Sequence, residues 1–422
     1  MENVIAVGVH RTNNKETASN RSIDELRELI ETAGGYVVET HIQNKEHPDR
    51  ATFIGKGKVS EIAERARVLK VHTVVFDDEL KPAQQKNLEE LLNTKVIDRT
   101  RLILDIFAQR ARTREGILQV ELAQLTYSLP RITAHFGRFE QQTGGIGTRG
   151  PGERKLEVDQ RRIYDRIAAL KKDIEKISQE RSLQREVRRG VPVPQVAIIG
   201  YTNAGKSTLL NTLLNQSAAL PDADYQQVYA DDKLFATLDP TTRRIRMPSS
   251  RIVLFSDTVG FIQKLPTALV AAFRATIEEI GTADLLLHVI DASDAEKEQQ
   301  EKSVQRLLED LHLHQLPRLK AYNKIDALSP EERMILSGTD SILISAKTGE
   351  GIEDLKQTIE KKLTEKWEEH DLHFQFDQER EITQLYALMD ILTRKTTTTG
   401  YDVRVRVHPQ TFAQWSQRRT SH

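Results

Sequence analysis

Eight consecutive residues near the middle of the chain have the types and spacing of a phosphate-binding loop. The sequence reads G-Y-T-N-A-G-K-S over residues 200–207, which fits the pattern G-x-x-x-x-G-K-[ST]. In such a loop the backbone N–H groups surround the phosphates, the lysine reaches the β- and γ-phosphates, and the serine hydroxyl ligates Mg²⁺. The residues expected around the phosphates are Gly200, Tyr201, Thr202, Asn203, Ala204, Gly205, Lys206, Ser207 and Thr208.

A second motif, N-K-I-D over residues 323–326, indicates which base is bound. It follows an apolar run, so it is expected at the carboxyl edge of a parallel sheet. The Asp326 carboxylate can accept hydrogen bonds from N1–H and the exocyclic amine of guanine, whereas adenine offers neither donor. Asn323 can bond the base and brace the phosphate loop, and the stem of Lys324 can lie over the ring. The residues expected at guanine are Asn323, Lys324, Asp326, Ser345, Ala346 and Lys347, with the Ala346 amide at O6.

A third motif, D-T-V-G over residues 257–260, ends another apolar run. We expect Asp257 to hold Mg²⁺ through water and the Gly260 amide to sense the γ-phosphate. A threonine between the first and third motifs should also close on Mg²⁺ when GTP is bound. The segment F-A-T-L-D-P-T-T at 235–242 favours Thr237 for this role, with Thr241 and Thr242 as alternatives.

The residue after Gly260 bears on catalysis. Many small GTPases carry a glutamine there that orients the attacking water, but this chain has Phe261, followed by Ile262. Neither can hold water, so we expect slow intrinsic hydrolysis that a partner stimulates, and no catalytic side chain is assigned. Asn203 allows two interpretations: it helps to bind K⁺, which would stabilise transition-state charge, or it only shapes the loop.

The elements that must position these motifs follow from the apolar patterns. Residues 1–113 alternate strand and helix and predict an α/β domain. Residues 114–190 predict a basic helical hairpin with a glycine-rich loop at 144–152. Residues 194–366 predict an α/β P-loop GTPase domain with a parallel-rich sheet. Residues 372–422 predict a small α+β domain, with strands at 373–376 and 403–407 and a helix over 378–394.

The hairpin prediction depends on apolar residues spaced alternately by four and three, which is the seam of paired helices. These residues are Leu118, Leu122, Leu125 and Leu129, and then Ile163, Ile167, Leu170, Ile174 and Ile177. Residues 149–190 contain 13 Lys/Arg against 8 Asp/Glu. This excess could lie along RNA phosphates or be a solvated face. The RNA-binding candidates are Gly144, Gly145, Gly147, Arg149, Gly150, Arg154, Lys155, Arg161 and Arg162. A second basic cluster, opposed only by Asp105, contains Arg99, Arg101, Arg110, Arg112 and Arg114.

Composition excludes several classes. The 422 residues include 61 Lys+Arg, 62 Asp+Glu and no Cys. Because a typical domain has roughly 150 residues, this length predicts two or three domains. The lack of Cys excludes disulfides, cysteine zinc sites and thiolate catalysis. No stretch approaches the roughly 20 apolar residues of a membrane helix, and the N-terminus lacks a signal-peptide pattern. We therefore expect a cytoplasmic protein.

Over about residues 1–365 the sequence resembles the HflX family of ribosome-associated GTPases. The resemblance rests on G-Y-T-N-A-G-K-S-T, F-A-T-L-D-P-T-T-R, D-T-V-G-F-I and G-G-x-G-x-x-G-P-G-E. It implies a role on the large ribosomal subunit and its rRNA, including the splitting of stalled or idle ribosomes. Together with the motifs, we expect a monomeric switch that uses GTP, GDP and Mg²⁺. Two other hypotheses stay open: a ribosome-assembly GTPase, and a protein-partner switch without RNA binding.

Overall fold

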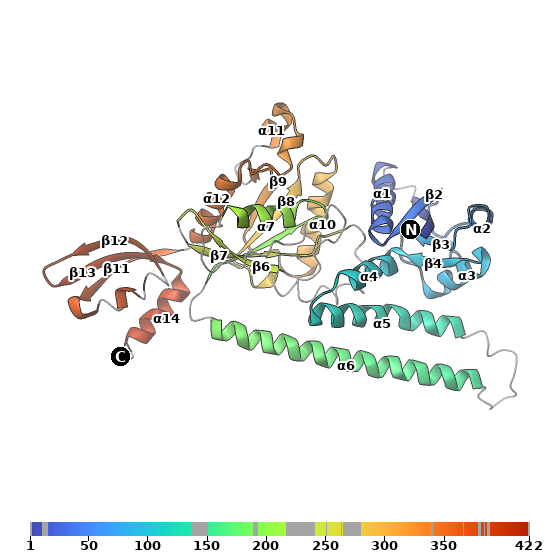
Figure 1. The fold of residues 1–422 in the computed structure, drawn as a ribbon, viewed down its shortest axis with the longest axis horizontal. Helices are drawn as coiled ribbons and strands as arrows, with labels where there is room; N and C mark the ends of the chain where they lie inside the picture. Colours follow the sequence, from blue (N-terminus) through green and yellow to red (C-terminus); the bar gives the residue numbers. More distant parts are fainter. Residues whose placement is uncertain are drawn as a thin grey trace.

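The chain forms three sheets, and a helical hairpin connects the first to the second. The structure is a computed structural model that describes residues 2–10, 16–136, 151–188, 193–216, 241–249, 251–262, 264, 280–336, 338, 341–365, 367–378, 381–383, 385 and 389–420. Figure 1 shows the N-terminal sheet on one side of the central sheet and the C-terminal sheet on the other. Helix α6 (Pro151–Arg188) runs below the central and N-terminal units in this view.

The N-terminal unit alternates strand and helix, as the sequence predicts. Its elements are β1 (Glu2–His10), α1 (Glu16–Thr32), β2 (Gly35–Asn44), α2 (Lys56–Val68), β3 (Thr73–Phe76), α3 (Pro82–Leu92), β4 (Lys95–Asp98) and α4 (Arg99–Arg110). The strands are all parallel in the order β2-β1-β3-β4. Pro82 opens α3 at its first turn, where no backbone N–H is needed. Helices α1 and α4 cover one face of the sheet, and α2 and α3 cover the other.

Helices α5 (Arg114–Phe136) and α6 form the predicted hairpin. Leu122 of α5 packs against Leu170 and Ile174 of α6. The opposite side of α5 contributes Val120 and Ala123 to the N-terminal core, so α5 is held from two sides. Helix α6 has 38 residues, which corresponds to about 57 Å at 1.5 Å per residue.

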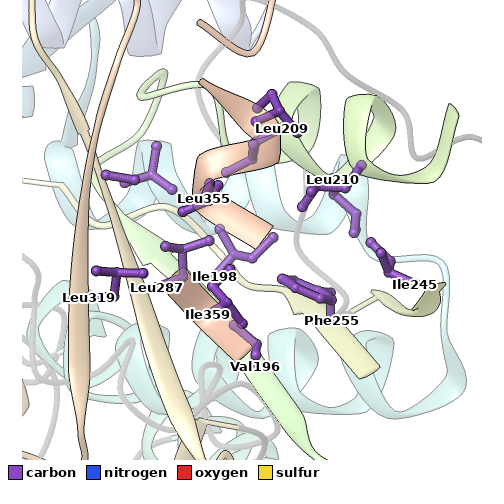
Figure 2. Close-up of a cluster of buried hydrophobic side chains, with 14 of the residues drawn as sticks. Val196, Ile198, Leu209, Leu210, Ile245, Phe255, Leu287, Leu319, Leu355 and Ile359 are labelled. Carbon is purple, nitrogen blue, oxygen red and sulfur yellow. The ribbon is translucent and has the colours of Figure 1, made fainter. Parts of the chain in front are cut away.

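The central sheet has the order β10-β9-β8-β5-β7-β6. Its elements are β5 (Gln195–Gly200), α7 (Lys206–Asn215), β6 (Thr241–Arg246), β7 (Ile252–Asp257), β8 (Leu285–Asp291), α10 (Lys297–Asp310), β9 (Arg318–Asn323), α11 (Pro330–Leu336), β10 (Ser341–Leu343) and α12 (Ile352–Thr364). Five strands are parallel, and β6 adds an antiparallel edge that the sequence pattern did not predict. Figure 2 shows the core between α7, α12 and the sheet, where Leu209 and Leu355 meet Ile198 and Leu287.

In the C-terminal unit one prediction from the sequence was wrong. A helix was expected over 378–394, but residues 390–396 are strand β12 (Asp390–Thr396), and only residues 381–383 and 385 are described as helical. β12 pairs antiparallel with β13 (Gly400–Val407), which pairs with β11 (Glu368–Gln375). The unpredicted helix α14 (Pro409–Thr420) packs Phe412 and Trp415 onto the sheet. The pairing with β13 decides for the strand, because helix and strand propensities differ by less than the gain from a shared core.

Candidate nucleotide site

The phosphate loop connects β5 to α7 in a conformation that its residue types permit. Asn203 has φ 61° and Gly205 has φ 89°, values in the left-handed region that asparagine and glycine tolerate best. A Cβ at Gly205 would lie 2.3 Å from Nδ2 of Asn323, so only glycine fits there. The loop therefore brings the N-terminus of α7 to the edge of the sheet.

Lys206 lies inside this loop. Its Nζ donates to the carbonyls of Gly200 at 3.1 Å and of Tyr201 at 2.7 Å, and the residue is 7% exposed. Burial lowers the pKa of Lys206 to about 8, and the Asp257 carboxylate opposes this shift only in part. A buried cation without an anionic partner in contact is unfavourable, so the loop is suited to receive phosphate charge.

The third motif supplies oxygen ligands next to the loop. The Ser207 hydroxyl donates to Oδ2 of Asp257 at 2.7 Å, which places a hydroxyl and a carboxylate side by side. This donor set fits Mg²⁺, which is usually held by one or two protein oxygens, waters and substrate phosphates. Among the described residues no group of three or more His, Cys, Asp or Glu could hold a metal ion by itself.

The threonine expected to close on Mg²⁺, Thr237, lies outside the described residues. The two alternatives belong to β6, the antiparallel edge strand. The Thr242 hydroxyl is 2.9 Å from Oγ of Ser256 on β7, and Thr241 pairs with Asp257 in the strand register.

The base-recognition motifs converge on the phosphate loop. The Asn323 amide donates to the carbonyl of Ala204 at 2.8 Å, and its Oδ1 accepts from the Ala346 N–H at 2.8 Å. The Ala346 amide expected at guanine O6 is thus bonded to Asn323 here. Asp326 is exposed, and its Oδ1 accepts from the Ser345 hydroxyl at 2.7 Å. This hydrogen bond lowers the pKa of Asp326, so its carboxylate is ionised and can accept from a base.

Lys324 and Lys347 complete this edge. Lys324 has φ 65°, and its Nζ is 2.8 Å from Asp291 Oδ2, so its head group is anchored. Lys347 is exposed.

The segment after Asp257 lies against the phosphate loop. Phe261 N–H donates to the Gly200 carbonyl at 3.1 Å, and Thr202 N–H donates to the Phe261 carbonyl at 2.8 Å. A Cβ at Gly260 would come within 2.9 Å of Nζ of Lys206. The Phe261 side chain is buried in the core beside Tyr201, Ile280 and Leu308. Thus the position where many GTPases hold a water-orienting glutamine is occupied by a core residue.

These features define the class. A parallel sheet with a G-x-x-x-x-G-K-[ST] loop, a D-x-x-G segment and an N-K-x-D motif at one edge belongs to a P-loop GTPase.

Comparisons with known proteins agree with this assignment to the P-loop GTPases. The chain matches families described as "GTP-binding GTPase N-terminal" over residues 20–108, "GTP-binding GTPase Middle Region" over 110–188 and "50S ribosome-binding GTPase" over 195–324. A "GTPase HflX" from Caldanaerobacter subterraneus subsp. tengcongensis is 45% identical over 92% of this chain and 87% of that relative. One from Magnetococcus marinus is 48% identical over 80% and 77%, and one from Escherichia coli is 41% identical over 92% and 89%. The chain belongs to the HflX GTPase family and is a GTP hydrolase.

The RNA-binding candidates are only partly described. Gly144, Gly145, Gly147, Arg149 and Gly150 lie outside the described residues, and Arg154 and Lys155 are described only as part of α6. Arg161 and Arg162 are exposed, and Arg162 is 3.8 Å from Asp159. No helix in the described part of the chain is long and apolar enough to cross a membrane.

One predicted basic residue is not available to RNA. Arg99, listed with the second basic cluster by its position in the sequence, is 1% exposed and pairs with Glu25 and Asp77. Arg101 pairs with Asp105 at 3.1 Å. Sequence reasoning missed Glu25 and Asp77 as residues near the nucleotide site. The available signal was an arginine directly after the buried strand 95–98, a position where a charge needs a partner.

Proposed function

We propose that the protein is a GTP-dependent switch that binds the large ribosomal subunit through its hairpin and splits or recycles stalled or idle ribosomes. The observation that carries this proposal is the exposure of basic side chains on the outer face of α6. Arg161 precedes the buried Leu170 by nine residues, or about two and a half helical turns, so the two residues lie on opposite sides of α6. Arg161 therefore faces away from the seam with α5. Lys172 is also exposed, close to the same outer face. The match to a family described as 50S ribosome-binding GTPases supports the choice of partner.

In this proposal the nucleotide-binding residues act in three groups. The loop amides from Gly200 to Thr208, with Lys206, bind the phosphates. The guanine group consists of Asn323, Lys324, Asp326, Ser345, Ala346 and Lys347. Ser207, Thr237 and Asp257 hold Mg²⁺, which neutralises phosphate charge when it is bound. Asn203 adds a K⁺ ligand only if the hydrolysis rate falls when Na⁺ replaces K⁺.

Hydrolysis by the protein alone should be slow. Phe261 is 8% exposed and Ile262 is 5% exposed, and both side chains pack into cores. Neither can hold the attacking water. The large subunit would therefore stimulate hydrolysis by supplying a group or by moving this segment.

The test is GTP hydrolysis with and without purified large ribosomal subunits, in K⁺ buffer at two salt concentrations. We expect strong stimulation that falls with salt, because each phosphate contact releases counterions. A double substitution, Arg161→Glu with Arg162→Glu, should weaken stimulation and leave the basal rate unchanged. The matched control is Lys302→Glu with Arg306→Glu, two exposed residues on α10, one helical turn apart, for which stimulation should stay as in the wild type.

Three outcomes would redirect the proposal. Preferential binding to precursor particles would favour a ribosome-assembly role. Absence of stimulation by any subunit, with salt-insensitive binding of a protein, would favour a protein-partner switch. Stimulation without dissociation of 70S particles into subunits, measured by sedimentation, would remove the splitting step but keep the partner.

A further inference from the structure

A buried polar network connects the two sides of the nucleotide site through the N-terminal unit. The Tyr201 hydroxyl, on the second residue of the phosphate loop, donates to Oε1 of Glu25 at 2.8 Å. Glu25 Oε2 is 3.0 Å from Nη1 of Arg99, and Arg99 Nη2 donates to Oδ1 of Asp77 at 2.9 Å. Lys264, four residues after Gly260, pairs with Asp77. The phosphate loop and the segment after the D-x-x-G motif are therefore tied to one arginine of another domain.

The charged groups at the centre of this network are buried. Glu25, Arg99 and Asp77 are 9%, 1% and 3% exposed. Burial opposes the ionisation of Asp77, but the charges of Arg99 and Lys264 hold its pKa below the usual value. The Ser22 hydroxyl donates to Asp77 Oδ2 at 2.6 Å, the same oxygen that faces Lys264. Displacing Arg99 would leave two buried carboxylates without their shared cation, which is strongly unfavourable.

The apolar contacts divide the same segment between two cores. Val259 and Ile262 pack into the N-terminal core with Leu26, Leu102 and Phe107. Phe261 packs instead into the core of the GTPase domain that contains Ile280 and Leu308. The D-x-x-G segment thus forms part of the boundary between the two domains.

Gly260 lies close to the lysine that would contact a γ-phosphate. Such a phosphate must contact both Nζ of Lys206 and the amide of Gly260. Here Gly260 lies so close that one added carbon would be 2.9 Å from that Nζ and 2.8 Å from Cα of Thr202. The β-phosphate would be bound by the loop amides, whereas a γ-phosphate would have to lie between Lys206 and Gly260, so its binding should depend more on the position of Gly260.

We propose that the ion pair between Asp77 and Lys264 is a latch that holds the D-x-x-G segment against the phosphate loop and favours GDP over GTP. Arg99 is the positioning residue that fixes Asp77 for this latch. Lys264 also lies 2.9 Å from Asp78, so its ammonium is held by two carboxylates. The inference rests on the proposed nucleotide site.

The test measures affinities for fluorescent GDP and for a non-hydrolysable GTP analogue by equilibrium titration. Lys264 is 40% exposed, so Lys264→Ala should fold. We expect its GTP-analogue affinity to rise relative to GDP affinity by about fivefold, the effect of losing one partly exposed ion pair. Lys264→Arg keeps the charge and should restore the wild-type ratio.

The matched control is Arg21→Ala. Arg21 pairs with Asp294 across the same boundary but is not joined to the phosphate loop. The ratio of GTP-analogue affinity to GDP affinity in Arg21→Ala should therefore match that of the wild type. An unchanged ratio in Lys264→Ala, or an equal change in Arg21→Ala, would overturn the latch. Failure of the wild-type protein to bind either guanine nucleotide would instead overturn the proposed nucleotide site.

Discussion

Asn323 and Ala204 are 119 residues apart in sequence, and the Asn323 side-chain amide donates to the Ala204 carbonyl at 2.8 Å. This bond joins the guanine-recognition motif to the phosphate loop. Because the other end of the same amide accepts from Ala346 N–H, one side chain holds three loops in register. We therefore expect base recognition and phosphate binding to depend on one another.

Removal of this brace should weaken both stability and binding. Asn323→Ala leaves a buried carbonyl and a buried N–H without their partner, so we expect the free energy of unfolding to fall by about 2 kcal/mol. Affinity for GDP should fall as well. Asn87→Ala is the control, because Asn87 makes the same kind of bond, to the Ala51 carbonyl, at an exposed site. Denaturant unfolding and nucleotide titration would measure the two effects, and equal losses in both variants would contradict the brace.

Base specificity should depend on Asp326. In Asp326→Asn an amide group replaces one carboxylate oxygen, so the N1–H and exocyclic amine of guanine lose an ionised acceptor. We expect guanine-nucleotide affinity to fall by about a hundredfold or more. Xanthine nucleotides, which carry a carbonyl in place of that amine, should bind the variant better than the wild type. Competition titrations would measure this, with Asp310→Asn on α10 as the control. Retained guanine preference in Asp326→Asn would remove Asp326 from the site.

The unfolding free energy of the nucleotide-free protein should depend on pH because Lys206 is buried. The pKa of Lys206 is about 8 in the folded chain and 10.5 as the ordinary value. Between these pH values the unfolded chain binds more protons, so the contribution of Lys206 to stability rises as pH rises through this window. The rise should be about 1 kcal/mol between pH 8 and pH 9.

Lys206→Met provides the reference for this measurement, because all other groups titrate alike in both proteins. The difference between wild-type and variant unfolding free energies, from denaturant titrations at pH 7, 8 and 9, should change less between pH 7 and pH 8 than between pH 8 and pH 9. A difference independent of pH would show that Lys206 is not desolvated in the empty site.

Introducing the usual glutamine should not create a faster enzyme. Phe261 packs into the GTPase core, so Phe261→Gln buries a polar group and removes apolar contacts. We expect a loss of about 3 kcal/mol in unfolding free energy and no gain in the basal hydrolysis rate. Phe376→Gln, at a residue 51% exposed, should change stability little. A rate gain in Phe261→Gln without loss of stability would mean that this side chain can reach the nucleotide.

The sequence alone predicted the features that local chemistry determines. The spacing of G-x-x-x-x-G-K-[ST], the proline at the start of α3 and the strand–helix alternation of residues 1–113 each depend on neighbouring residues. A phosphate loop needs glycine where φ is positive or where another chain segment lies close, and these needs act within a few residues. Pattern and structure therefore agree for these features.

Tertiary structure decided what depends on distant partners. Residues 390–396 form a strand only because β13 is there to pair with them. Arg99 was placed in a basic surface cluster by its neighbours in sequence, but the fold buries it between two carboxylates from separate segments. Phe261 and Ile262 are adjacent apolar residues, and only the packing of two domains sends one side chain into each core. Such outcomes are set by burial and charge pairing across long sequence separations, which no local pattern encodes.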